Sequence, residues 1–517
     1  MQSGVTSRFK KQIPKNAIMA FLSFLAYALS AIWLTPYLVG YLGPAAYGLV
    51  PLAAMFTQYV SILTSEISTS VNRFLTIEIQ RGGGDPNRVF NSSLFLYLIL
   101  IAIQVPLFSL AIIHADRLFS IPPDLRLDAL LLFGFSAASF LLSLLGAVFG
   151  ISIFSANRLD VGSALAIVSL LLRLVSIIAL FGFFGPKLRY IGYVDFCLQV
   201  MSLLVSVYYW RVLTPELSIS FKAVDVKLLN PVFRMSFWGL INRTGSLLYE
   251  KSDIWIINRF ISPIVAGQYA AILVVSNFVR QLSVQIGAQF APTIMDCWAK
   301  DDLVNLKRLL AFTIKMLAFG LTIPAALLCL RGGAILHTWL GPEFAPLAPL
   351  LILCVVHLPV NMAINPFFTL NKASNRVRVP AIVSFCLGVF NLAASYYLGV
   401  ELALGAWGVA LVTALVLTAK NALFTPIYGA RILGLPALSF LKPIFASVSV
   451  YALAYAISLV PLARWLGSAR HEIVGLLLEG ALISFVCGLV FWFVVVSKSE
   501  KATLLSMLPG RARRLVG

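Results

Sequence analysis

Charged side chains recur within one long apolar segment, residues 236–258. It carries Arg243, Glu250, Lys251 and Asp253, and at about 100° per residue Glu250 falls about 20° from Arg243 with the other two on either side. Charges on one half of a helix either line a hydrated cavity or form an internal ion-pair network, and both interpretations stay open here. The carboxylates of Glu250 and Asp253 are candidate binding groups for H⁺ or Na⁺.

Amide side chains occupy every fourth position of the next apolar segment, residues 265–290. They are Asn277, Gln281, Gln285 and Gln289, with Arg280 beside them. Residues four apart share a helix face. Because polar groups facing lipid lack hydrogen-bond partners, this stripe is expected to face protein or water.

Arg173 lies among leucines near the middle of a third apolar segment, residues 162–183. A basic side chain at the centre of a membrane helix costs about 2.5–3.5 kcal/mol. Arg173 is therefore expected either to line a cavity or to pair with a carboxylate. Six basic residues lie within such segments: Arg173, Arg243, Lys251, Arg280, Lys315 and Lys420.

The balance of charge inside these segments is positive, because fewer carboxylates accompany the six basic residues. Guanidinium groups removed from water suit a phosphate or pyrophosphate, which they bind through paired hydrogen bonds. The predicted ligand is anionic, and the predicted substrate-binding residues are Arg173, Arg243, Lys251, Arg280 and Gln281. No catalytic residue is assigned. The cysteines and histidines form no metal-ligand spacing, so no metal site is assigned either.

The composition explains why these charges matter. Of 517 residues, 60% are hydrophobic and 11% are charged, whereas soluble domains carry about 25% charged residues. This excludes a soluble enzyme, a disordered chain and a fibrous protein, and it indicates a polytopic membrane protein surrounded by lipids. The formal net charge of +19 then reflects lipid headgroups and topology, and no nucleic-acid partner is expected.

Fourteen apolar stretches of about 20 residues must position these groups. They cover approximately 17–39, 45–68, 90–113, 129–152, 162–183, 191–210, 236–258, 265–290, 309–330, 346–370, 379–399, 404–426, 442–461 and 473–497. The predicted fold is an all-α polytopic membrane protein with 14 transmembrane helices.

Basic residues in the connecting segments predict the orientation. Twenty-five lie in the segments on the side of the N-terminus and eight on the opposite side. Basic residues concentrate in cytoplasmic loops. We therefore expect both the N- and C-termini in the cytoplasm.

Short matches separated by about 220 residues indicate an internal repeat. Ala156–Val161 resembles Ser374–Val379, and Leu42–Gly48 resembles Ile264–Ala270. The predicted lobes are 17–210 (helices 1–6) and 236–426 (helices 7–12), joined by a cytoplasmic linker, 211–235. A leader (1–16), helices 13 and 14 (442–497) and a basic tail (498–517) lie outside the repeat. Parallel repeats of this kind are typical of transporters with a site between the lobes.

Other classes lack their signatures. No GxxxxGK[ST] motif is present, which excludes a built-in ATP motor. Asp301 and Asp302 could suggest the carboxylate pair of a membrane glycosyltransferase, but acidic residues that begin a cytoplasmic segment are typical of a solvated turn.

Four short segments carry a family resemblance. They are Tyr41–Gly48, Ser68–Arg73, Ser155–Asp160 and Gln289–Thr293. With them the chain resembles the polysaccharide transporter family, the Wzx-type flippases of the multidrug/oligosaccharidyl-lipid/polysaccharide superfamily. The resemblance implies two pseudo-symmetric six-helix bundles facing in a V, as in MATE-like transporters, plus helices 13 and 14. The family has no strict site motif, so the site residues depend on the charge analysis.

The resemblance also implies a function. It implies export of undecaprenyl-pyrophosphate-linked oligosaccharides, the repeat units of O-antigen or exopolysaccharide, across the inner membrane. It further implies a cationic cavity, coupling to H⁺ or Na⁺ with no other cofactor, and other polysaccharide assembly proteins as partners. The alternatives are a lipid II flippase and a cation-coupled multidrug antiporter, with a membrane-embedded glycosyltransferase or ligase more remote.

Overall fold

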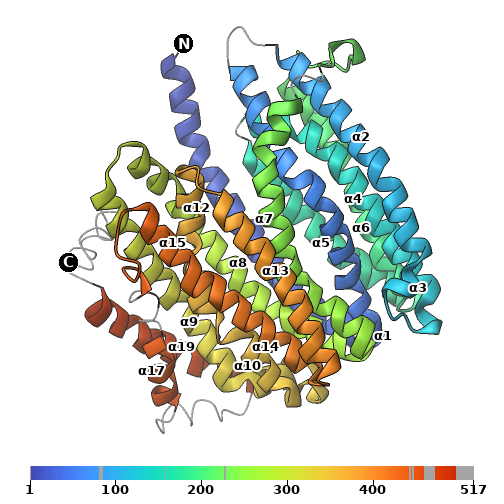
Figure 1. Ribbon diagram of the computed structural model, residues 1–517. Coiled ribbons are helices and arrows are strands. Elements are labelled where there is room, and N and C mark those ends of the chain that lie inside the picture. Colours follow the sequence, from blue (N-terminus) through green and yellow to red (C-terminus); the bar gives the residue numbers. More distant parts are fainter. Residues whose placement is uncertain are drawn as a thin grey trace. The chain divides into compact units, whose positions relative to one another are not determined.

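The computed structural model describes residues 2–80, 85–156, 158–225, 229–441, 444, 448–458 and 472–496. Throughout these residues the chain forms helices and turns, with no strand (Figure 1). Contacts divide the chain into two compact units, residues 1–274 with 381–409 (unit 1) and residues 275–380 with 410–517 (unit 2). The expected all-α fold is confirmed, and the boundaries of the two repeat lobes stay a prediction.

Unit 1 is built from long apolar helices and short 3₁₀ and π turns. Its elements are α1 (Gln2–Gln80), α2 (Pro86–Ile113), α3 (Ala115–Leu118), η1 (Pro123–Leu125), α4 (Arg126–Ser155), α5 (Leu159–Phe184), α6 (Arg189–Leu213), η2 (Phe221–Ala223), α7 (Leu229–Ile256), η4 (Ile257–Ile261), the start of α8 (Pro263–Ala299), most of α13 (Arg378–Tyr396), η6 (Tyr397–Glu401) and the start of α14 (Gly405–Thr418). Helices α4 and α6 pack side by side, and α1 packs against α5, α7 and α4.

Helix α1 contains the first two predicted spans. Gly43 interrupts its helical geometry with φ 78° and ψ 161°. A positive φ is easily adopted only by glycine. The interruption falls between predicted spans 17–39 and 45–68, so α1 consists of two helices that meet at Gly43, one for each predicted span.

Two close helix crossings in unit 1 depend on glycine. A Cβ on Gly245 of α7 would lie 2.4 Å from the backbone carbonyl carbon of Ser384, on α13. A Cβ on Gly267 of α8 would lie 1.8 Å from the carbonyl oxygen of Pro44, on α1. Small residues allow membrane helices to approach at backbone distance, and these crossings use that freedom. The second crossing brings together the repeat-related segments 42–48 and 264–270.

Unit 2 contains the rest of α8 and α14 and the remaining helices. These are α9 (Leu303–Leu340), η5 (Pro342–Leu347), α10 (Ala348–Val355), α11 (Leu358–Met362), α12 (Asn365–Ala373), η7 (Ala419–Phe424), α15 (Thr425–Ile432), α17 (Val448–Ser458), α19 (Glu472–Val490) and η8 (Phe491–Val495). The Arg331 guanidinium of α9 holds the buried Glu479 of α19 through two hydrogen bonds of 2.8 and 3.1 Å.

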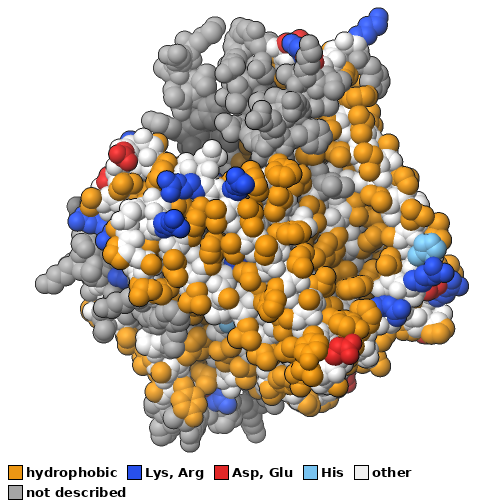
Figure 2. Space-filling model, viewed as in Figure 1, with side chains coloured by type: hydrophobic (Ala, Val, Ile, Leu, Met, Phe, Trp, Pro, Cys, Tyr) orange, Lys and Arg blue, Asp and Glu red, His pale blue; other side chains and the backbone are white. Residues whose placement is uncertain are grey.

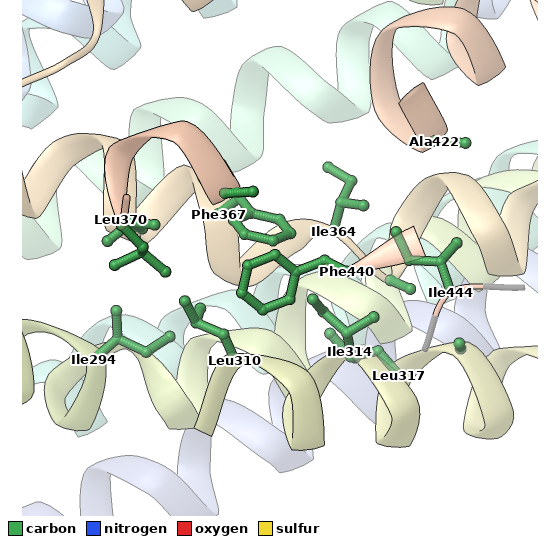
Figure 3. Packing of buried hydrophobic residues seen from close by; sticks show 14 of the residues in the cluster. Ile294, Leu310, Ile314, Leu317, Ile364, Phe367, Leu370, Ala422, Phe440 and Ile444 are labelled. Atoms are coloured by element: carbon green, nitrogen blue, oxygen red, sulfur yellow. The ribbon is translucent and has the colours of Figure 1, made fainter. Parts of the chain in front are cut away.

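The main core of unit 2 joins α8, α9 and α12 with the segment after α15 (Figure 3). Phe367 and Phe440 meet edge to face at its centre, with ring centroids 5.0 Å apart. Both side chains are fully buried. This packing fixes α12 against α9.

The predicted span 346–370 is not one helix. It is divided into α10, α11 and α12 by breaks at 356–357 and 363–364. Pro359 and Pro366 cause the interruption, because proline lacks the N–H that bonds the carbonyl four residues earlier. The carbonyl of Met362, which Pro366 leaves without its N–H, accepts a hydrogen bond of 2.8 Å from the Ser283 hydroxyl of α8.

The surface is that of a membrane protein. Hydrophobic side chains cover most of the face seen in Figure 2, and charged side chains occur there in small groups. Eleven helices in the described part are long and apolar enough to cross a membrane, with Ile18–Ile62 counted as one. The charged α7 is not among them, and Ser449–Ser458 of α17 is a shorter apolar helix. The count of fourteen spans stays a prediction.

Candidate functional site

Asp253 of α7 is the centre of an acid cluster in unit 1, formed by Asp253, Tyr269 and Tyr59. The Asp253 side chain is buried, and the Tyr269 hydroxyl of α8 donates a hydrogen bond of 2.9 Å to its Oδ2. Tyr59 of α1 lies within electrostatic range of Asp253, and its hydroxyl donates to the carbonyl of Leu247 at 3.2 Å. The cluster offers a buried carboxylate held by a phenol, which suits a proton or a small cation.

The other charged residues of α7 have different surroundings. Arg243 and Lys251 are half-buried, whereas Glu250 is exposed. No salt bridge involving Arg243 or Glu250 occurs among the described residues. The charged residues predicted to share one half of α7 therefore lie in different environments, because the Asp253 side chain is buried in the protein and the Glu250 side chain is exposed.

Arg173 of α5 forms a bidentate ion pair with Asp195 of α6. Its Nε and Nη2 lie 2.7 and 2.9 Å from the two carboxylate oxygens. Both side chains are about one-third exposed. The pair neutralises Arg173 within unit 1. Of the two roles expected from the sequence, cavity lining and pairing with a carboxylate, the structure shows the pairing.

The amide stripe of α8, defined by Asn277, Gln281, Gln285 and Gln289, is exposed along its whole length. Exposed amides inside a membrane need water or a polar ligand, because lipid offers no hydrogen-bond partner. The predicted stripe is thus a hydrated surface of unit 2. Amides both donate and accept hydrogen bonds, and sugar hydroxyls require both.

A basic cluster lies beside this stripe, formed by Arg280, His357, Asn361 and Thr418. Two hydrogen bonds align α8 with the broken span: Ser276 donates to the Cys354 carbonyl at 3.3 Å, and Ser283 donates to the Met362 carbonyl at 2.8 Å. Arg280 lies between the two serines, as His357 lies between Cys354 and Met362. Arg280 is thereby at the level of His357, and it is the charged group that acts on the imidazole.

Hydrogen bonds connect the broken span to α14 within the basic cluster. The Asn361 amide nitrogen lies 2.8 Å from His357 Nδ1 and donates to Thr418 Oγ1 at 3.0 Å. Asn361 is fully buried, and its Oδ1 has no hydrogen-bond partner in the described part of the chain. Arg280 is half-buried and forms no salt bridge within the same part.

The cluster can bind an anion, because Arg280 and polar side chains meet where the span is interrupted, although the backbone at 356–357 and 363–364 keeps right-handed helical dihedrals. The charge pattern of the sequence predicts Arg280 and Gln281 as binding residues, but it does not point to His357, Asn361 and Thr418. The available signal was the pair of prolines within a single apolar span.

The acidic pair Asp301–Asp302 has a structural role. Asp302 caps α9 by accepting hydrogen bonds from the side-chain and backbone amides of Asn305, and these hold the pKa of Asp302 below its usual value. Asp301 occupies a turn with φ 55°. The turn expected from the sequence is what the structure contains.

The fold is that of membrane flippases and transporters. The structure of the lipid II flippase MurJ in an inward closed conformation matches with a TM-score of 0.69 and 14% identity, over 93% of this chain and 99% of that one. An inward-facing MATE-family multidrug transporter of the MOP superfamily matches with a TM-score of 0.64 and 16% identity, over 80% and 94%. The chain shares the fold of these two proteins.

Sequence comparison identifies the family. The family model described as polysaccharide biosynthesis protein matches residues 13–298. The uncharacterized membrane protein EpsK of Bacillus subtilis (strain 168) is 31% identical over 490 residues, which are 93% of this chain and 95% of that protein. The chain belongs to the polysaccharide biosynthesis protein family, and the resemblance found in the sequence is confirmed.

Proposed function

We propose that the protein is a flippase that moves a polyprenyl-pyrophosphate-linked oligosaccharide from the cytoplasmic to the periplasmic leaflet by alternating access. The observation that carries the proposal is Arg280, a half-buried arginine without a carboxylate partner among the described residues, beside the exposed amide stripe. An arginine binds a pyrophosphate, the amides bind sugar hydroxyls, and the polyprenyl chain stays in lipid. Arg243 and Lys251 of α7 supply further positive charge.

Arg173 has a different part in this proposal. Because Asp195 neutralises it, its contribution to anion binding is small, and its main effect is to hold α5 against α6. Flipping is coupled to H⁺ or Na⁺ at Asp253, where a buried carboxylate that accepts a hydrogen bond from a phenol can exchange its ion. Glu250, which is exposed, binds the ion transiently as it enters.

The test is flipping of a fluorescent polyprenyl-pyrophosphate oligosaccharide in proteoliposomes. Arg243→Ala/Arg280→Ala should lower the rate by at least tenfold, because charge-assisted hydrogen bonds to the pyrophosphate are lost. Arg126→Ala is the matched control, since Arg126 is 62% exposed and pairs with Asp116 outside the predicted spans. Wild-type flipping by the double variant, at equal protein incorporation, would refute the proposal.

Two alternatives follow from the fold shared with MurJ and the MATE transporter. A lipid II flippase would bind the same pyrophosphate with a different glycan, and a multidrug antiporter would bind organic cations. Mass spectrometry of lipids that co-purify with the protein separates them. A bound polyprenyl-pyrophosphate repeat unit supports the proposal, lipid II supports the first alternative, and organic cations without such lipids support the second.

The proposed location is the plasma (inner) membrane with both termini in the cytoplasm. The excess of basic residues in one set of connecting segments supports this orientation. A C-terminal green fluorescent protein should be fluorescent, and a C-terminal alkaline phosphatase inactive, if the terminus is cytoplasmic. Partners in the same membrane would be other polysaccharide assembly proteins, which crosslinking in cells would identify.

A further inference from the structure

His357 sits at the break between α10 and α11, at the level of Arg280. We propose that His357 and Arg280 bind one phosphate group together, and that His357 takes up a proton at Nδ1 as the phosphate binds. The anion and a proton are then loaded and released as one unit. The proposal deepens the proposed function and rests on it.

The hydrogen bond at Nδ1 defines the state without ligand. The Asn361 amide nitrogen, 2.8 Å away, can only donate, so Nδ1 accepts and the neutral ring carries its proton on Nε2. No hydrogen-bond partner of Nε2 lies among the described residues. This N–H is therefore a free donor beside Arg280, and a phosphate oxygen is the acceptor that both groups can share.

The Asn361 side chain can satisfy both protonation states. Rotating its amide by about 180° brings Oδ1, which is buried without a hydrogen-bond partner in the described chain, into the position now held by the nitrogen. Oδ1 then accepts from His357 Nδ1–H, and the Thr418 hydroxyl turns from the Ala414 carbonyl to Oδ1. The proton comes from water along the amide stripe and returns to water when the phosphate leaves.

The charges around His357 make its proton depend on the anion. Burial and the charge of Arg280 both oppose a positive charge on the imidazole, and the negative charge of a bound phosphate offsets that opposition. Because proton and anion each favour binding of the other, the coupling between them is reciprocal.

The described residues of the other elements around this site supply no carboxylate. Helix α11 packs against α9 and η7. At this level α9 contributes Leu321 and Leu328, which pack around Leu358, while its Arg331 is paired with Glu479. From η7 comes the buried Lys420, whose Nζ lies 5.5 Å from the centre of the Phe368 ring. The remaining titratable neighbours are Cys354 of α10 and Tyr451 of α17, which donates to the Val356 carbonyl at 2.9 Å.

The carboxylates of unit 2 lie elsewhere in the described chain. Asp296, Asp301 and Asp302 are at the end of α8 and the start of α9. Glu343 begins η5, Glu472 begins α19, and Glu479 holds Arg331. Among the described residues of unit 2, no acidic group at the level of His357 supplies the negative charge that a ligand would bring.

The experiment measures protons taken up when inorganic pyrophosphate binds to the full-length protein in nanodiscs. Calorimetry in buffers of different ionisation enthalpy gives the number at pH 7. His357→Gln mimics the neutral imidazole. The amide oxygen of the glutamine can accept the hydrogen bond from Asn361, and its amide nitrogen can donate as the imidazole Nε2–H does. The wild type should take up about one proton more than His357→Gln, and its affinity should fall more steeply with rising pH, approaching tenfold per unit.

A second variant keeps the test informative if His357→Gln folds poorly. Asn361→Asp places a fixed acceptor at Nδ1, so His357 should keep its proton and binding should lose its extra pH dependence. Equal proton uptake by wild type, His357→Gln and Asn361→Asp would overturn the proton step while leaving the flippase intact. Absence of pyrophosphate binding would overturn the joint phosphate site.

Competition distinguishes the two sources of the phosphate. Undecaprenyl pyrophosphate in the nanodisc should displace inorganic pyrophosphate with the same proton balance, whereas displacement by inorganic phosphate alone would assign the site to the free anion and overturn coupling to the lipid. The proposed function fails separately, when Arg243→Ala/Arg280→Ala flips at the wild-type rate.

Discussion

The crossing of α7 and α13 at Gly245 allows a quantitative test of the structure. Replacing Gly245 with alanine puts a Cβ 2.4 Å from the backbone carbonyl carbon of Ser384 and 2.5 Å from the backbone nitrogen of Phe385. Ordinary contact begins near 3.4 Å, so the two helices must separate by about 1 Å. The neighbouring atoms are backbone, and no side chain can rotate to make room.

Two effects of opposite sign set the magnitude. Alanine in place of glycine favours a helix by about 1 kcal/mol. Overpacking costs about 1–3 kcal/mol, and rigid backbone neighbours favour the upper end. The net expectation is a loss of about 2 kcal/mol, which lowers the apparent melting temperature by roughly 4 °C for a unit of this size.

Gly134→Ala is the matched control. Gly134 lies within α4, and a Cβ there meets nothing within 4 Å. It should be neutral or stabilising by up to about 1 kcal/mol, since only the helix propensity changes. Both variants would be measured by thermal unfolding in nanodiscs, followed by tryptophan fluorescence. If Gly245→Ala moved the melting temperature in the same direction as Gly134→Ala, the close crossing would be wrong.

Three further predictions concern individual hydrogen bonds. Glu479→Gln should destabilise the protein by about 3 kcal/mol, because it leaves the Arg331 guanidinium without its charged partner; an unchanged melting temperature would contradict this. Tyr269→Phe removes the donor to Asp253 and should change the ion concentration at half-maximal flipping about tenfold, whereas identical ion dependence would exclude Asp253 as the coupling site. Asp302→Ala should lower the melting temperature at pH 7, because the charged carboxylate caps α9. Hydrogen bonds hold the Asp302 pKa below its ordinary value of 3.8. The carboxylate therefore contributes its full stabilisation above pH 3.8 and loses it as the pH falls through the lowered pKa. The difference in melting temperature between Asp302→Ala and the wild type should vanish only below that lowered pKa.

The sequence by itself determined the membrane class, the helical fold and the family. An apolar stretch of about 20 residues has the length that crosses a bilayer as a helix. The helix is required because, in lipid, every backbone N–H and C=O group must form its hydrogen bond within the protein. Four-residue spacing likewise determined that Asn277, Gln281, Gln285 and Gln289 share a face, since helix geometry is local.

Only the tertiary structure decided the partners of the buried charges. The sequence left Arg173 between a cavity and an ion pair, and the packing of α5 against α6 put Asp195 within 2.7 Å of it. The sequence did not distinguish Asp253 from the other charged residues of α7. In the structure, the Tyr269 hydroxyl of α8 donates a hydrogen bond to the Asp253 carboxylate. His357 lies inside the predicted span 346–370, whereas the structure divides that span into α10, α11 and α12 and places His357 at the level of Arg280. The reason is physical: helix formation depends on neighbouring residues, but the partner of a buried charge depends on which distant helix packs against it.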